Sequence, residues 1–233
     1  MYKKKSYQQY WLKNKYMNYC PKKGECYMPT LLEQLANCFT HGIGIIPAIF
    51  AVWKMLKRSL TNEQLFCTIL YGTAFISLFT VSTTFHALSL AYRSSVCCRI
   101  FHLGDRFIIY IYIAATYTPW FLLQCNEEYG ASSSNLVWLF AFIGVSYTMF
   151  YHEKYKMFET IIYLFHGFFP AALLAKLSTK GFFELAFGGL LYVIGVFFFK
   201  SDGKIPFAHA VWHIFSLTAA WIHHFAIWTH LYI

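Results

Sequence analysis

Long runs of apolar residues, separated by short polar stretches, occupy almost the whole chain after its first thirty residues. A stretch of about 20 mostly apolar residues is long enough to cross a bilayer as a helix. Seven such stretches occur, and the short connections between them predict that each helix runs antiparallel to the next. The predicted helices cover residues 32–53, 65–91, 101–124, 135–151, 157–176, 182–200 and 208–231.

The composition also indicates a membrane protein. Hydrophobic residues make up 58% of the chain and charged residues only 12%, whereas about a quarter of the residues in a soluble domain are charged. We therefore predict an all-α membrane protein whose residues 31–233 form a seven-transmembrane helix bundle. Residues 1–30 form a separate basic segment, and we expect no cleavable signal peptide there because no apolar run follows the first residue.

The distribution of positive charge predicts the orientation of the bundle. Cytoplasmic loops of membrane proteins collect lysine and arginine. With a cytosolic N-terminus, fourteen of the 19 lysines and arginines fall on the cytosolic side and five on the other. We therefore predict a cytosolic N-terminus and an extracellular or lumenal C-terminus. The net charge of +9 then reflects topology and contact of the N-terminal lysines with anionic membrane lipid, and no nucleic-acid partner is expected.

A few polar side chains inside the predicted helices are expected at one depth. Such residues are costly in lipid and often mark functional sites. Ser82 and His86 come late in the second helix, Asp105 comes early in the third, and His209 and His213 come early in the seventh. Because successive helices run in opposite directions, all five side chains should lie near the cytosolic face.

These residue types suit a zinc site. His209 and His213 are four residues apart and so share one face of a helix, a spacing that helical zinc sites also use. His86 would complete a set of three nitrogen ligands, which suits Zn²⁺ and leaves a fourth position for water. Asp105 could orient or deprotonate that water, and Ser82 could support a neighbouring group or an oxyanion. Such a site could hydrolyse an amide or ester.

Simpler interpretations of the same residues stay open. Two histidines at a helix end are often interfacial packing residues rather than metal ligands. Ser82 could bond back to its own helix, as serine commonly does in membranes. Asp105 could form a boundary charge pair with Arg106.

The first predicted helix carries a polar stripe made of Glu33, Asn37 and His41. We favour an interhelical hydrogen-bond seam for this stripe, with Glu33 as a proton carrier near the zinc as the alternative. A proton-linked transporter that uses Glu33 and His41 is a weaker hypothesis, because the chain lacks an internal repeat. The later histidines of the seventh helix are expected at the opposite interface, too far away to share the ion: His223, His224 and His230.

Three motifs resemble those of the progestin and adipoQ receptor (PAQR) family, which is related to bacterial hemolysin III-type proteins. They are STTFH, which spans residues 82–86, LGDR, which contains Asp105, and HAVWH, which spans residues 209–213. The segments YHEKYK, FFKSDGKIPFAHAVWH and AATYTPW resemble the monocyte-to-macrophage differentiation factor branch of the family. The resemblance covers essentially all of residues 30–233.

The resemblance implies a seven-helix bundle in which His86, His209 and His213 hold zinc and Asp105 acts through the zinc-bound water. Kinship with alkaline ceramidases implies a zinc-dependent lipid amidase with a ceramide-like substrate and a receptor-type signalling role. The alternative is a non-enzymatic receptor or scaffold, with structural zinc, that modulates kinase or cytokine signalling. The branch is associated with late endosomal, lysosomal or Golgi membranes, so we expect an endomembrane location and signalling proteins as partners.

Overall fold

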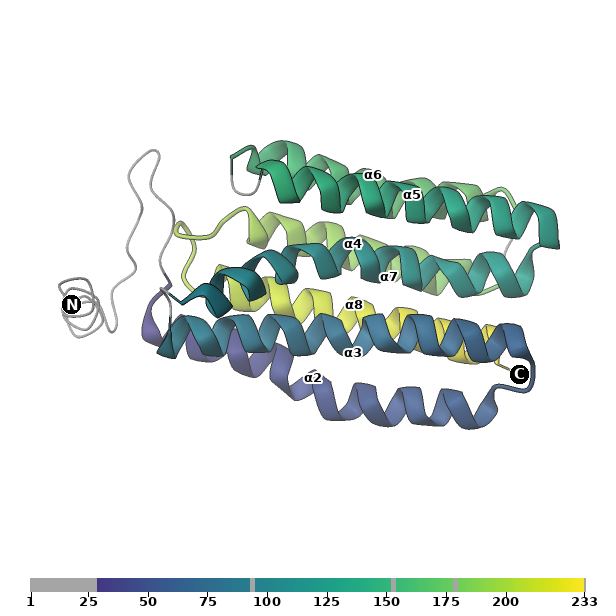
Figure 1. Ribbon diagram of the computed structural model, residues 1–233, viewed down its shortest axis with the longest axis horizontal. Helices are drawn as coiled ribbons and strands as arrows, with labels where there is room; N and C mark the ends of the chain where they lie inside the picture. Colours follow the sequence, from purple (N-terminus) through teal and green to yellow (C-terminus); the bar gives the residue numbers. More distant parts are fainter. Residues whose placement is uncertain (1–28, 93–94, 152–153, 178–179, 233) are drawn as a thin grey trace.

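The computed structural model describes residues 29–92, 95–151, 154–177 and 180–232. These residues form seven α-helices and no strand, which confirms the predicted all-α bundle. The helices lie side by side with their long axes roughly parallel (Figure 1). The seven lysines of the predicted basic segment lie outside the described residues. The helices are α2 (Leu31–Arg58), α3 (Asn62–Ala91), α4 (Val96–Gln124), α5 (Glu127–Tyr151), α6 (Lys156–Ala175), α7 (Phe182–Phe199) and α8 (Ala208–Leu231).

Six of the described helices, α2 to α7, are long and apolar enough to cross a membrane. The seventh, α8, has 24 residues, of which five are histidines, and it is not among these six. It packs against α2, α4 and α7. Since neighbouring helices cover much of α8, its polar side chains can lie inside the bundle, where polar residues of membrane helices are usually found.

The helix boundaries follow the predicted apolar stretches closely, and the largest difference is at the start of α5. The apolar pattern predicts this helix over residues 135–151, but the helix begins at Glu127. Its first turn contains Glu127 and Glu128, and acidic side chains interact favourably with the positive end of a helix dipole. The apolar pattern therefore detects the part of a helix suited to hydrocarbon and misses polar turns that extend it.

The surface and the centre of the bundle both match a protein that is surrounded by lipid. Large apolar side chains are exposed along the outer faces of the helices, among them Phe39, Phe142 and Phe183. Aromatic residues fill the centre, where Tyr71 and Phe75 are fully buried. An extensive apolar exterior is expected where the solvent is hydrocarbon instead of water.

Alternate helices begin at the same end of the bundle. α2, α4, α6 and α8 begin there, and α3, α5 and α7 end there (Figure 1). We call it the histidine end, because His86 near the end of α3 meets His209 and His213 near the start of α8. The sequence predicts that this end faces the cytosol.

Candidate metal site

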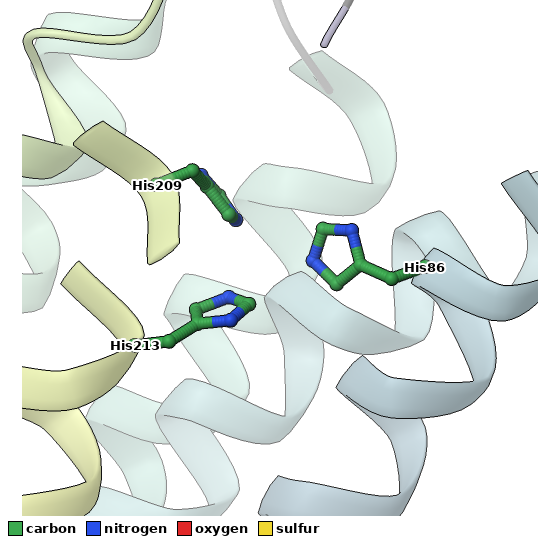
Figure 2. Close-up of side chains that lie close together, drawn as sticks. All are labelled: His86, His209 and His213. Atoms are coloured by element: carbon green, nitrogen blue, oxygen red, sulfur yellow. The ribbon is translucent and has the colours of Figure 1, made fainter. Parts of the chain in front are cut away.

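Three histidines from two helices converge at the histidine end (Figure 2). His86 projects from α3, and His209 and His213 project from the first two turns of α8. One ligand nitrogen from each ring lies within 4.8 Å of those of the other two. Two nitrogens that each bind zinc at about 2.1 Å are at most about 4.2 Å apart, so small ring rotations would bring all three into binding distance.

The start of α8, which carries two of the three histidines, is held by a residue of α2. The backbone N–H of Phe207 donates to Oε1 of Glu33 at 3.0 Å, and the other carboxylate oxygen of Glu33 accepts from the N–H of Thr30 at 2.7 Å. Phe207 itself has a φ of 57°, a left-handed conformation that is unfavourable for residues other than glycine. Glu33 thus joins the first turns of α2 and α8 and supports the predicted interhelical seam.

His86 and His209 each use Nδ1 for a polar contact with another part of the chain. Nδ1 of His86 lies 3.0 Å from Oε1 of Gln34 in α2. Nδ1 of His209 lies 2.9 Å from Oδ2 of Asp202 in the connection between α7 and α8. These contacts fix the plane of each ring and favour the tautomer in which Nδ1 carries the proton.

His213 is held in a similar way by α2. Its Nδ1 lies 3.3 Å from the backbone carbonyl oxygen of Asn37 and 3.1 Å from Oγ1 of Thr40. The ring also stacks on His41, with ring centroids 3.8 Å apart and an interplanar angle of 22°. His213 is therefore fixed by both hydrogen bonding and packing.

The opposite ring nitrogens provide the evidence that a metal fits here. Nε2 of His86 and Nε2 of His209 are both buried, and neither has a hydrogen-bond partner among the described residues. A buried polar atom without a partner costs free energy, and one bound ion would satisfy both atoms. Histidine ligands typically contact a carboxylate or carbonyl group through their other ring nitrogen. The three histidines therefore fit Zn²⁺, for which three imidazole ligands are common.

The two predicted catalytic residues lie in the same region. Asp105 is within electrostatic range of His209 and has Ser82 as a neighbour. The Ser82 hydroxyl is buried, and within the described part of the chain it has no hydrogen bond of good geometry. The structure thus brings Ser82, Asp105 and the three histidines together, and the roles of the first two stay predictions.

Arg106 lies within electrostatic range of its neighbour Asp105 and also contacts residues of α6 and α7. Its Nη1 lies 4.0 Å from Oε2 of Glu159 in α6, and its guanidinium group lies over the ring of Phe199, 4.8 Å from the centroid. Tyr163 donates its hydroxyl to the same Glu159 at 3.2 Å. Arg106 therefore belongs to a polar contact between α4 and α6, next to the histidines.

The prediction for His223 and His224 is wrong. Both are buried inside the bundle, 5% and 8% exposed, and do not lie at the interface. Nε2 of His223 lies 3.0 Å from the carbonyl oxygen of Leu185 in α7. His223 can pack there because residue 188 is a glycine, since a Cβ atom at Gly188 would be 2.4 Å from the His223 ring. His230, by contrast, is only partly buried, and its Nε2 lies 3.2 Å from Oε1 of Glu184.

Sequence reasoning missed three residues that contact the candidate ligands: Gln34, Thr40 and Asp202. Gln34 and Thr40 are each next to a member of the predicted polar stripe, and this position could have indicated that they lie near the site. Asp202 lies in a polar turn before the HAVWH motif, outside the predicted helices, so no helix pattern indicated where its side chain lies.

Comparisons with known proteins give one consistent result. Residues 30–224 match the family described as "Haemolysin-III related". The human protein named "Monocyte to macrophage differentiation factor" is 44% identical over 227 residues, which cover 94% of this chain and 92% of the human protein. "Hemolysin-3 homolog" of Bacillus subtilis is 32% identical over 197 residues, which cover 82% of this chain and 90% of that protein. These matches confirm the resemblance predicted from the motifs.

Proposed function

Because the chain belongs to the haemolysin-III related (HlyIII/PAQR) family of multi-pass membrane proteins, we propose that it is a zinc-dependent hydrolase of a ceramide-like lipid amide. The observation that carries the proposal is the arrangement of the histidines. Their Nδ1 atoms are held by the protein, and two Nε2 atoms are buried without a partner in the described residues. Orientation of this kind suits a metal ligand better than a packing residue.

His86, His209 and His213 would hold the ion. Zinc bound there would act as a Lewis acid toward the amide carbonyl group and would activate water for attack. Asp105 would accept a proton from the attacking water at its carboxylate and return it to the nitrogen of the leaving amine. Ser82 Oγ–H would donate either to the developing oxyanion or to Asp105. The C–N bond breaks, and a fatty acid and an amine are released.

We propose that this reaction takes place at the cytosolic boundary of a late endosomal, lysosomal or Golgi membrane. The predicted orientation puts the histidine end at that boundary, where the carbonyl groups of lipids also lie. The apolar outer faces of the helices leave the protein surrounded by candidate substrates. Release of a lipid amine and a fatty acid would then link the protein to signalling proteins.

A second candidate function is a non-enzymatic receptor or scaffold with structural zinc that modulates kinase or cytokine signalling. The observation that favours it is the set of contacts around the histidines. A metal held by α3 and α8 would lock elements that are already joined to α2 through Gln34 and Asn37. Structural metal sites stabilise a fold in this manner.

One experiment separates these functions. Purified protein, with and without bound zinc, is incubated with a panel of ceramides and other lipid amides, and released fatty acid is measured by mass spectrometry. The wild type should hold one zinc and release fatty acid, whereas Asp105→Asn should hold zinc and release none. His230→Ala, which changes a histidine of α8 at the opposite end, is the matched control and should behave as the wild type.

Two other results would contradict the proposed hydrolase. Zinc without release from any substrate, together with normal signalling by Asp105→Asn in cells, would support the structural role. A wild-type protein without stoichiometric metal would remove both functions.

A further inference from the structure

A second group of buried polar side chains lies near the middle of the bundle, deeper than the candidate metal site. It consists of Tyr71 of α3, Tyr112 of α4, Tyr192 of α7 and His224 of α8, and we call it the tyrosine cluster. The three hydroxyl oxygens and Nδ1 of His224 are all buried, and none has a hydrogen-bond partner among the described residues. Four helices therefore each contribute one unpartnered polar atom.

The members of the tyrosine cluster are neighbours. The ring centroids of Tyr71 and Tyr112 are 6.3 Å apart, and those of Tyr71 and His224 are 6.1 Å apart. The hydroxyl of Tyr112 interacts with the hydroxyls of both Tyr71 and Tyr192, although no pair among the described residues reaches good hydrogen-bond geometry. The three hydroxyls are therefore close to one another without satisfying one another, and the ring of His224 packs on Tyr71 beside them.

The tyrosine cluster is separate from the candidate metal site. His224 follows His213 by 11 residues on the same helix, which corresponds to about 16 Å. The aromatic rings of Phe75 and Phe79 lie between the two groups. Phe75 stacks on His224, with centroids 5.3 Å apart, and Phe79 meets the edge of His41 at 5.6 Å. The ligands of the metal thus cannot satisfy the tyrosine hydroxyls.

A line of hydroxyl groups approaches the tyrosine cluster from the end of the bundle opposite the histidine end. Oγ of Ser59, just after the last turn of α2, lies 2.9 Å from Oγ1 of Thr68. Thr68 donates to the hydroxyl of Tyr232 at 2.8 Å, and Tyr232 lies within electrostatic range of Tyr71. Bonded hydroxyl groups therefore extend from the helix end as far as Tyr232.

We propose that Tyr71, Tyr112, Tyr192 and His224 form a binding site for internal water. A buried water molecule needs two to four polar partners, and the tyrosine cluster supplies four from four helices. Phenol and imidazole groups can each donate and accept a hydrogen bond, so one or two shared waters satisfy every member. All four groups are uncharged in their usual buried forms, which suits water better than an ion.

The direct test labels the wild-type protein and requires no mutation. X-ray radiolysis converts bound water to hydroxyl radicals, which modify side chains next to that water, and mass spectrometry identifies them. Tyr71 and Tyr112 should be modified at least several-fold faster than Phe121, which is also fully buried, after correction for the intrinsic reactivity of each residue type. Equal rates for the tyrosines and Phe121 would overturn the proposal.

A second test measures thermal stability. Tyr71→Phe and Tyr192→Phe should each lower the midpoint by about 2–4 °C, the effect of one lost hydrogen bond in a protein of this size. The double variant should lose less than the sum, because both hydroxyls share a water network. Tyr117→Phe gives the reference for a direct bond, since its hydroxyl donates to the carbonyl oxygen of Gly167 at 2.6 Å.

An exposed tyrosine provides the control. Tyr151→Phe, at a tyrosine that is 44% exposed, should leave the midpoint unchanged. If the hydroxyls of the tyrosine cluster bond to nothing, their removal relieves buried polar atoms and keeps or raises the midpoint, which contradicts the proposal. Neither test depends on zinc or on hydrolysis, so failure of the proposed enzyme function would leave both results interpretable.

Discussion

The histidine end and the tyrosine cluster both bury polar groups inside a membrane bundle, but they present those groups differently. At the histidine end, each imidazole is fixed from behind by a partner on another element, such as Gln34 or Asp202. In the tyrosine cluster, no hydrogen bond to a described residue fixes the hydroxyls. Fixed nitrogen atoms suit an ion with defined ligand geometry, whereas freely rotating hydroxyls suit water. Orientation from a second layer of residues therefore distinguishes a candidate metal site from a hydrated interior.

The largest expected effect comes from removing a ligand. His86→Ala should abolish zinc binding, because two remaining histidines on one helix cannot retain zinc against a chelator. The wild type should lose stability on chelation to about the level of the variant, since metal that binds only the folded state stabilises it. Elemental analysis and thermal unfolding with and without zinc measure both effects. A variant that kept one zinc per chain would show that the three histidines are not the ligands.

The second prediction concerns orientation itself. Asp202→Asn should weaken zinc binding about 10–100-fold, the usual effect of losing a partner that orients a ligand, while one zinc still binds at saturation. A competition titration against a chromophoric chelator measures the affinity. Glu184→Gln is the matched control, because Glu184 contacts His230 in the same way at the opposite end. An equal loss of affinity in both variants would argue against a specific role of Asp202.

The fold followed from the sequence because a membrane-spanning helix needs about 20 mostly apolar residues in a row. Even α8 was found in this way, although it contains five histidines and is not among the six helices that are apolar enough to span a membrane by length and composition. The polar start of α5 was not found, since Glu127 and the residues after it lie beyond the apolar stretch and only the structure shows that they continue the helix. The length of an apolar stretch thus identifies a span and leaves its polar ends undefined.

The candidate site was predictable only in part. Helix direction placed His86, Asp105, His209 and His213 at one depth, and the structure brings them together. The contact of Asp202 with His209 depends on a turn between two helices, which has no periodic pattern. The burial of His223 depends on Gly188 in another helix, a pairing that requires knowledge of how α7 packs on α8.

The third prediction tests the connection between α2 and α8. Glu33→Gln should lower the free energy of unfolding by about 1–2 kcal/mol, because the charged acceptor of the Phe207 N–H becomes neutral. Zinc affinity should fall as well, since Glu33 positions the turn that carries His209. Denaturant unfolding in detergent and the competition titration give the two values. Glu63→Gln, at an exposed glutamate in the first turn of α3, should lose only the small helix-dipole contribution of an exposed side chain and should keep the zinc affinity. A fall in stability without a change in affinity would limit Glu33 to a structural role.

The smallest expected effect tests whether the strained backbone of Phe207 affects only stability or also the orientation of the metal ligands. Phe207→Gly should raise the free energy of unfolding by up to about 1 kcal/mol, because glycine adopts the observed φ of 57° without a steric penalty. The gain is small because glycine also increases the entropy of the unfolded chain, and little packing is lost since the side chain is 40% exposed. Zinc affinity should not change, because the N–H that Glu33 accepts is still present. A weaker zinc affinity in Phe207→Gly would mean that the rigid backbone before α8 helps Asp202 and Glu33 to orient the ligands. The histidine end would then differ from the tyrosine cluster in its backbone as well as in its side-chain contacts.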